Sequence, residues 1–214
     1  MISSTFIKNE ALKHLKGFWA QAAIITIVFY VISFAVSGTS SLSAAPAFVI
    51  GSSLLSLLIL PLSWGFIVLF LDKLRGGAVD AGNLFDGYKD FWRVFGTLLL
   101  RGVYTFLWTL LLIVPGIVKS LSYAMTPFIL KDYPKASYDT AIIYSMRLMQ
   151  GHKTDLFVLY LSFIGWFILS CLTLGIGFVF LVPYCQMSLA RFYEEVKADF
   201  ESDDSLLDTD EEDE

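Results

Sequence analysis

The chain of 214 residues is 56% hydrophobic and only 16% charged, with a mean hydropathy of +0.67. This composition excludes an ordinary soluble domain, because several apolar runs are long enough for a lipid bilayer. The net charge of −5 combines two unlike parts: residues 1–191 hold 14 Lys and Arg against 8 Asp and Glu, whereas residues 192–214 hold 12 acidic residues and one lysine. We therefore expect an all-α fold, a polytopic membrane helical bundle with about six transmembrane helices and two cytoplasmic interfacial amphipathic helices.

The first apolar run, residues 18–36, follows a basic leader and has nearly the ~20 residues that cross a bilayer. A cleavable signal peptide is the alternative, because Ser43-Ala44-Ala45 resembles a cleavage site. We favour a span, because the run is longer than a usual signal-peptide core and the chain stays hydrophobic beyond it. The second span is expected at residues 48–71, with a kink at Pro61 near its centre.

An amphipathic helix is expected before the third span. Apolar and aromatic side chains recur there on one helical face, namely Leu84, Phe85, Tyr88, Phe91, Trp92 and Phe95. Such a helix would lie in the headgroup region. In the third span, residues 94–114, Arg101 lies about two turns from the start and is a functional candidate. We favour snorkelling to the cytoplasmic headgroups over a gating or lipid-binding role.

Pro115 and Gly116 should break the helix and return the chain through residues 117–130. This segment is too short for a comfortable upright span, so it either crosses beside the third span or is re-entrant. We favour a crossing, because the distribution of Lys and Arg along the chain then becomes strongly asymmetric.

A second cytoplasmic amphipathic helix is expected between Ser137, as N-cap, and Gly151, after its C-terminus. It either lies on the inner leaflet or packs beneath the bundle as a coupling element, with Arg147 away from its apolar face. His152 and Lys153 form a juxtamembrane basic pair, which we favour over a catalytic or pH-sensing pair because no suitable partner set lies nearby in the sequence.

The fifth and sixth spans are expected at residues 156–172 and 176–190. Gln186 is the strongly polar side chain in the sixth, and a helix-to-helix hydrogen bond is the expected role. The acidic segment 192–214 should be a disordered cytoplasmic tail, because like charges repel. A solubilising tail is favoured over a docking tail for a basic partner.

Charge sets the expected topology. With six spans and both termini in the cytoplasm, Lys119 is the one outward cation apart from Arg101 within the membrane. The cytoplasmic cations are then Lys8, Lys13, Lys16, Lys73, Arg75, Lys89, Arg93, Lys131, Lys135, Arg147, Lys153, Arg191 and Lys197.

The strings PGIVKSLSYAM, ILKDYP, SMRLMQGHKTDLF, LSFIGWFIL and LGIGFVFLVPY resemble the bacterial integral membrane family catalogued as domain of unknown function 975. The resemblance covers about residues 11–193 and is densest at residues 115–184. Thr140 departs from the acidic residue expected after Ser137. More loosely, the pattern is similar to the membrane module of some glycerophosphodiester phosphodiesterases. The resemblance implies a protein of the bacterial cytoplasmic membrane and no particular activity.

The sequence offers no catalytic, cofactor-binding or metal-ligating set, so an intramembrane enzyme is disfavoured. We expect a non-enzymatic membrane accessory, scaffold or regulatory protein that contacts lipid and a protein partner, through its cytoplasmic helices or its acidic tail, and no nucleic acid. A transporter or channel component for a small solute or lipid is the alternative, with the Pro115 region as its best support. The sequence does not specify the oligomeric state.

Overall fold

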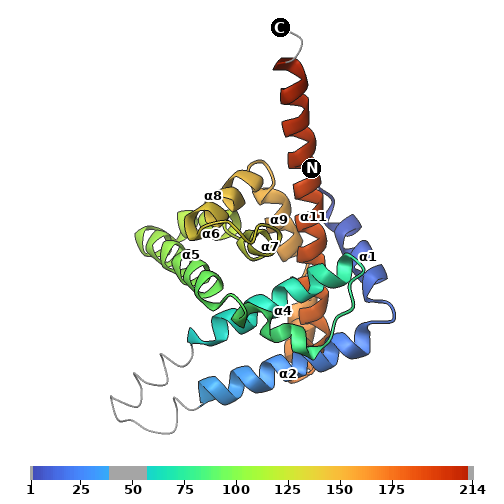
Figure 1. The fold of residues 1–214 in the computed structure, drawn as a ribbon. Helices are drawn as coiled ribbons and strands as arrows, with labels where there is room; N and C mark the ends of the chain where they lie inside the picture. Colours follow the sequence, from blue (N-terminus) through green and yellow to red (C-terminus); the bar gives the residue numbers. More distant parts are fainter. Residues whose placement is uncertain (1, 39–56, 212–214) are drawn as a thin grey trace.

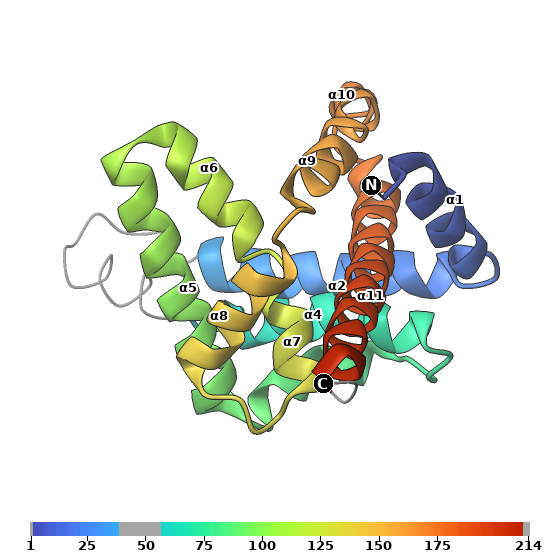
Figure 2. The ribbon, with the colours of Figure 1, turned by 90° about the horizontal axis from the view of Figure 1, so that it is seen from above.

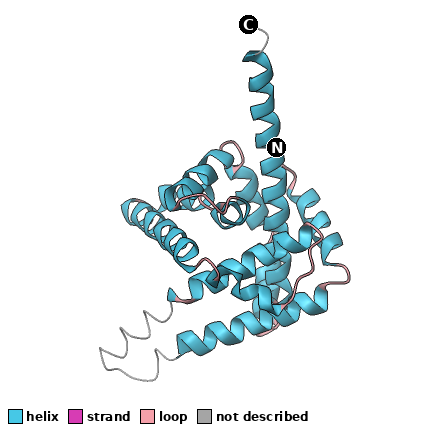
Figure 3. Ribbon diagram, viewed as in Figure 1, coloured by secondary structure: helices cyan, strands magenta, loops and turns pink. Residues whose placement is uncertain are grey.

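The computed structural model describes residues 2–38 and 57–211, and within these ranges every regular element is a helix (Figures 1 and 3). The predicted all-α class is therefore confirmed for the described chain. The elements are α1 (Ser4–Leu15), α2 (Trp19–Gly38), α4 (Ile59–Leu74), the 3-10 helix η2 (Ala81–Tyr88), α5 (Phe91–Leu111), α6 (Ile113–Ser122), α7 (Thr126–Asp132), α8 (Tyr138–Leu148), α9 (Lys153–Leu161), α10 (Ile164–Leu172) and α11 (Phe178–Glu211).

The long helix α11 is the axis of the bundle, and α1, α2, α4 and α10 all pack against it. On α1, Ile7, Ala11 and Leu15 recur every fourth residue and are fully buried. This spacing places them on one face, so burial of that face against α11 fixes α1 along the axis. Figure 1 shows the far end of α11 projecting beyond the other helices.

Helices α4 and η2 lie so close together that their backbones are in contact at two glycines. A Cβ atom at Gly65 would lie 2.2 Å from the Leu84 oxygen, and one at Gly87 would lie 2.2 Å from the Pro61 oxygen. Pro61 itself lies in the first turn of α4 and not near the middle of a described helix, so the predicted kink stays a prediction. Proline fits a first turn because its missing N–H would have no helical partner there. Residues 48–56 of the predicted span lie outside the described residues.

The amphipathic helix predicted around residues 84–95 is divided between two elements. η2 ends at Tyr88, and α5 begins at Phe91 after Asp90, whose backbone is not helical (φ −127°, ψ 56°). The predicted aromatic face persists across this break, because the rings of Tyr88 and Phe91, and of Phe91 and Phe95, stack with centroids 6.2 and 5.2 Å apart.

Helices α5 and α6 form a tight hairpin that stands away from α11 (Figure 2). The break between them is the single extended residue Leu112 (φ −159°, ψ 139°), not the predicted Pro115-Gly116 pair. Pro115 lies in the first turn of α6, where proline is tolerated. Gly116 lies where α6 meets α5: a Cβ there would come within 2.5 Å of the Thr109 hydroxyl oxygen.

Four helical stretches in the described chain are long and apolar enough to cross a membrane: Trp19–Val36, Phe91–Leu111, Ile113–Asp132 and Lys153–Leu172. The third joins α6 and α7 and gives the predicted return segment the length of a crossing. The predicted second span lies partly outside the described residues, and the predicted sixth is the start of α11. The count of six therefore stays a prediction.

The packing of α1 differs from the predicted topology at the point where the chain enters the bundle. The Ile2 amide donates to the Asp155 carboxylate at the beginning of α9 (2.9 Å), while the Trp19 and Phe180 rings lie 6.2 Å apart at the beginning of α11. Helix α1 thus runs along α11, and α2 starts beside the α10–α11 turn. The six-span topology places the start of α2 on the cytoplasmic side of the membrane and the α10–α11 turn on the outer side. The contact between Trp19 and Phe180 speaks against that placement.

The predicted disordered tail from Phe192 is wrong for residues 192–200. Helix α11 continues through this segment, and Phe192, Tyr193 and Val196 are buried in the core. The Phe200 ring also packs against Tyr144 of α8, with centroids 5.7 Å apart. Charge counting missed this apolar face because its residues are interspersed with the acidic ones.

Candidate functional site

A charged cluster joins three helices at the end of α7. The Asp132 side chain is only 7% exposed and accepts hydrogen bonds from Arg75 (2.6 and 2.8 Å), Lys197 (2.8 Å) and Tyr193 (2.9 Å). Arg75 also donates to Glu194 at 2.7 Å. We call these five residues the Asp132 junction. It fixes α4 and α7 to the middle of α11.

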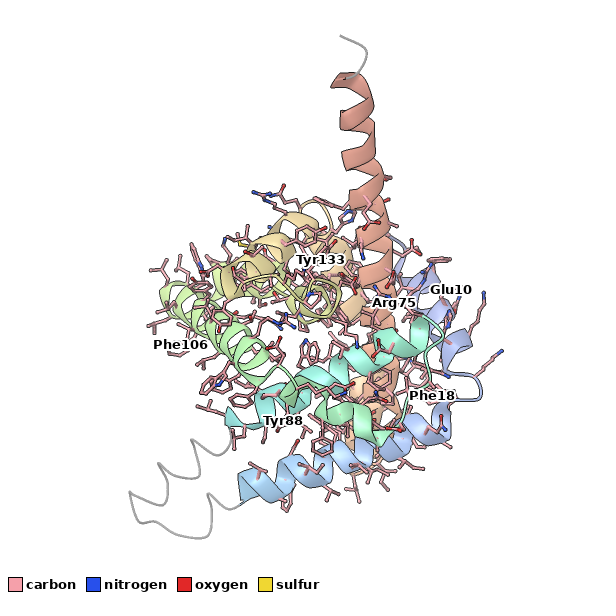
Figure 4. All side chains as sticks on the ribbon, viewed as in Figure 1. Glu10, Phe18, Arg75, Tyr88, Phe106 and Tyr133 are labelled. Carbon is pink, nitrogen blue, oxygen red and sulfur yellow. The ribbon has the colours of Figure 1, made fainter. Side chains whose placement is uncertain are left out.

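Each member of the Asp132 junction occupies the place that its helix provides. Arg75 is the C-cap of α4, and Asp132 is the last residue of α7. Tyr193 and Lys197 are four residues apart, so they share one face of α11. Stacking of Tyr193 on Phe128 of α7, with centroids 5.1 Å apart, holds the phenol in place. Figure 4 shows Arg75 where α4 crosses α11.

The electrostatics of the Asp132 junction favour the charged forms of Arg75 and Lys197 beside the Asp132 carboxylate. The hydrogen bond to Asp132 raises the pKa of the Arg75 guanidinium above its ordinary value. Burial is the largest influence on the pKa of Lys197 and lowers it, but the hydrogen bond to Asp132 and the charge of Asp132, with smaller contributions from Tyr133 and Glu201, together outweigh burial, so the net shift is upward. Burial, and then the Asp132 charge, raise the pKa of Tyr193, which therefore stays a hydrogen-bond donor. Two cations and one phenol thus surround one carboxylate.

A cavity of about 510 Å³ borders the Asp132 junction under the α7–α8 connection. Asp132, Tyr133, Lys135 and Tyr144 are among its lining residues. The Lys197 ammonium lies 5.7 Å from the centre of the Tyr133 ring, so the junction and the cavity share a wall. The surroundings of Asp132 combine fixed charges with an accessible hollow.

Two of the predicted candidates, Arg147 and His152, line a second pocket of about 380 Å³ together with Gln150 and Asp199. His152 Nδ1 lies 3.7 Å from Asp155, and its Nε2 lies 3.9 Å from Asp199. The imidazole thus stands between carboxylates of α9 and α11. The adjacent candidate Lys153 begins α9 and is not among the residues that line this pocket.

The predicted ends of the second amphipathic helix are confirmed. Ser137 is the N-cap of α8, and Gly151 follows the helix with a left-handed backbone (φ +81°). Thr140, which departs from the expected acidic residue, takes part in the cap: its hydroxyl lies 2.8 Å from the Ser137 hydroxyl. Helix α8 contacts α5, α6, α7 and α11. These contacts agree with packing against the bundle, and the role as a coupling element stays a prediction.

Arg101 lies in the middle of α5, with ten residues before it and ten after it in Phe91–Leu111. At 1.5 Å per residue, its Cα is about 15 Å from either end of the helix. The predicted span had placed Arg101 closer to its cytoplasmic end, and the favoured snorkelling role stays a prediction. Within the described chain Arg101 forms no ion pair, although it interacts electrostatically with Tyr160 of α9.

The remaining candidates do not join these pockets. Pro115 and Gly116 belong to the α5–α6 hairpin, as described above. Gln186 lies in α11, and its side-chain oxygen is buried with no hydrogen-bond partner among the described residues. The interhelical hydrogen bond expected for this residue is therefore not made by its oxygen.

Sequence reasoning missed all five members of the Asp132 junction as functional candidates. A signal was present, because Arg75 and Asp132 each lie within four residues of the end of an apolar run, where polar side chains end the buried part of a helix. Treating residues 192–214 as disordered removed Tyr193, Glu194 and Lys197 from consideration. Long-range pairing, with 119 positions between Arg75 and Glu194, is not visible in local patterns.

The arrangement can bind charge and hold helices in register. Among residues 2–38 and 57–211, no three His, Cys, Asp or Glu side chains gather as a metal site would require. The two free thiols, Cys171 and Cys185, lie on α10 and α11 respectively.

Comparison with known protein families gives a match in the second half of the chain. Residues 110–199 match the family described as a protein of unknown function, DUF975. Nothing among the curated proteins or the solved structures matches, and nothing supports the looser similarity to glycerophosphodiester phosphodiesterases. The match runs from the end of α5 to α11 and includes Asp132, Tyr193, Glu194 and Lys197. The resemblance read from the sequence is thus confirmed over residues 110–199, where the chain is similar to this family.

Proposed function

We propose that this protein is a non-enzymatic accessory or scaffold of the bacterial cytoplasmic membrane, which docks a basic protein segment on the acidic end of α11. The proposal has two parts, a membrane-embedded body and a water-exposed docking helix. Each part has its own support.

Exposed apolar surface supports the embedded body. On α2, Val31 and Phe34 are 61% and 78% exposed; on α5, Phe106 is 65% exposed and lies on the outer side of the hairpin (Figure 4). A soluble monomer rarely leaves so much large apolar side chain in contact with water. Lipid removes this conflict, because hydrocarbon is the solvent that such a surface requires.

The projecting end of α11 carries the docking part of the proposal. The Asp132 junction anchors α11 through Tyr193 and Lys197, and Phe200 is the last contact described with another helix. Beyond it the helix continues to Glu211 away from the body (Figure 1), in the strongly acidic sequence DDSLLDTDE. Such a charge run opposes an isolated helix. A basic partner segment would offset this repulsion.

Proximity of the two ends supports a location of both termini on one side, the cytoplasm. Ile2 binds Asp155, and His152, at the start of the same helix, lies near Asp199 on α11. The beginning of the described chain and the departure of α11 thus share one end of the molecule. Arg75, Lys131 and Lys197 lie in ion pairs near this end, as the positive-inside rule favours.

A transport component is the second candidate, and Arg101 favours it. A cation at mid-helix without an ion-pair partner in the described chain is a feature of anion or substrate pathways. We rank it second because the described chain surrounds Arg101 with no other ionised group.

A photo-crosslinking amino acid at Leu207, in native membranes, tests the docking proposal. We expect crosslinks to a lysine- or arginine-rich segment of one protein, identified by peptide mapping. Replacing every Asp and Glu after Ser202 with Asn and Gln should abolish them. A matched control that shuffles the order of residues 203–214 keeps the charge and should retain them.

Crosslinks that survive charge neutralisation, or that reach only lipid or a second copy of the chain, would contradict the proposal. Solute uptake by vesicles reconstituted with the purified protein would then support the transport candidate. Truncation belongs after Ser202, because removing residues from Glu194 onward would also dismantle the Asp132 junction.

A further inference from the structure

An apolar groove of about 380 Å³ lies between α1, the start of α2, α10 and the start of α11. Its two aliphatic hydroxyls are already used, because Ser170 donates to the Trp166 oxygen (2.8 Å) and Thr173 donates to the Ser170 oxygen (2.9 Å). The volume is typical of a ligand site. The walls suit a hydrocarbon, and they include Leu12, Trp19, Trp166, Leu169, Phe180 and Leu181.

The groove is continuous with surface that faces lipid. Trp166 and Leu169 line it while remaining 53% and 51% exposed, and both belong to the membrane-spanning stretch Lys153–Leu172. The neighbouring Leu172 is 75% exposed. A molecule already dissolved in the bilayer can therefore enter the groove from the side.

A second pocket, of about 510 Å³, meets the groove at Leu12. Its lining includes Glu10 and Lys13 of α1, and Lys16, which is the C-cap of that helix. Lys13 is paired with Glu10 at 2.5 Å, which neutralises both charges. Lys16 forms no ion pair with any described residue, so it leaves one uncompensated positive charge in this pocket, next to the groove.

We propose that the two pockets together bind one anionic phospholipid, with an acyl chain in the groove and the phosphate beside Lys16. The apolar groove matches the acyl chain and Lys16 matches the phosphate of such a lipid, and the lateral opening gives the lipid a path from the bilayer into the groove. A zwitterionic lipid would fill the groove equally well but would gain less from Lys16, because its positive headgroup offsets its phosphate.

Native mass spectrometry of the purified full chain, titrated with dioleoyl phosphatidylglycerol or dioleoyl phosphatidylcholine, tests this site. We expect the phosphatidylglycerol to bind about fivefold more tightly, the effect typical of one lysine beside an anionic headgroup. Lys16→Gln should abolish the preference. Leu12→Trp should weaken binding of both lipids by narrowing the groove.

Lys8→Gln is the matched control, because Lys8 is on the same helix but faces the Phe163 ring (5.8 Å) and lines neither pocket. The preference should persist in this variant. Equal binding of the two lipids by the wild type, or a preference that survives Lys16→Gln, would overturn the headgroup assignment. Binding that survives both Leu12→Trp and Leu169→Trp would overturn the groove; the second variant narrows the opposite wall, should the first lose thermal stability.

Discussion

The α5–α6 hairpin and the Asp132 junction are held in place by opposite kinds of contact. At the hairpin tip, Leu111, Leu112 and Ile113 are 68%, 62% and 71% exposed, so most of their apolar area faces outward. At the junction, Tyr193 is fully buried and the Asp132 carboxylate is shared among three donors. The hairpin depends on its solvent being lipid, whereas the junction is complete within the chain.

This difference shows where each region is sensitive. Without a hydrophobic driving force in lipid, α5 and α6 associate through close backbone approach, as at Gly116 and Thr109. The junction instead combines partly buried charges, whose desolvation is offset by hydrogen bonds. Loss of one partner should therefore matter more at the junction than loss of one contact in the hairpin.

The largest effect is expected from Asp132→Ala. It removes the shared acceptor of Arg75, Lys197 and Tyr193, and breaking a buried ion pair typically lowers the free energy of unfolding by about 4 kcal/mol. Thermal unfolding of the purified protein in detergent or nanodiscs measures the loss. The matched control is Glu201→Gln, because Glu201 is 60% exposed and lies 3.9 Å from the same Lys197. Equal stability of the two variants would show that the junction is not a structural lock.

The next effect concerns Arg101 in the hairpin. Arg101→Leu should improve insertion of α5 by about 3 kcal/mol, because arginine at a helix centre opposes insertion by about that amount. Arg101→Lys should leave insertion and phenotype unchanged if only charge is needed, and Arg101→Glu should impair insertion. Glycosylation-based insertion assays measure the energy. Loss of phenotype in the lysine variant at normal membrane abundance would instead assign the guanidinium a specific anion or lipid.

Gly116→Val tests the close contact between α5 and α6 in the hairpin, and the expected loss of stability is smaller than at the Asp132 junction. The new Cβ would lie 2.7 Å from the Thr109 Cα, which forces α5 and α6 apart and lowers stability by about 2 kcal/mol. Gly102→Ala on α5 is the control, because a Cβ there has no atom within 4 Å. It should leave the unfolding temperature unchanged or raise it. A loss of the same size in both variants would exclude close packing as the reason.

The sequence predicted what depends on local pattern, and the structure supplied what depends on packing. Hydropathy predicted the apolar stretches, and residue type predicted the Ser137 cap and the Gly151 end of α8, because these effects act within a few residues. The Asp132–Lys197 pair spans 65 positions, so no local pattern contains it. Burial of Tyr193 within an acidic segment was missed for the same reason, since average charge conceals a single apolar face.

Helix α8 links the two regions, and Ser137→Ala tests that link with the smallest expected effect. The helix reaches the hairpin through Ser145, which donates to the Ser122 oxygen of α6 (2.8 Å), and it reaches α11 through Tyr144, whose ring meets Phe200. Loss of the N-cap should cost about 1 kcal/mol and increase hydrogen exchange across α8 and at both of its contacts. Ser120→Ala is the control, because that hydroxyl bonds only within its own helix. Exchange that rises in α8 alone would mean that the hairpin and the junction are stabilised independently.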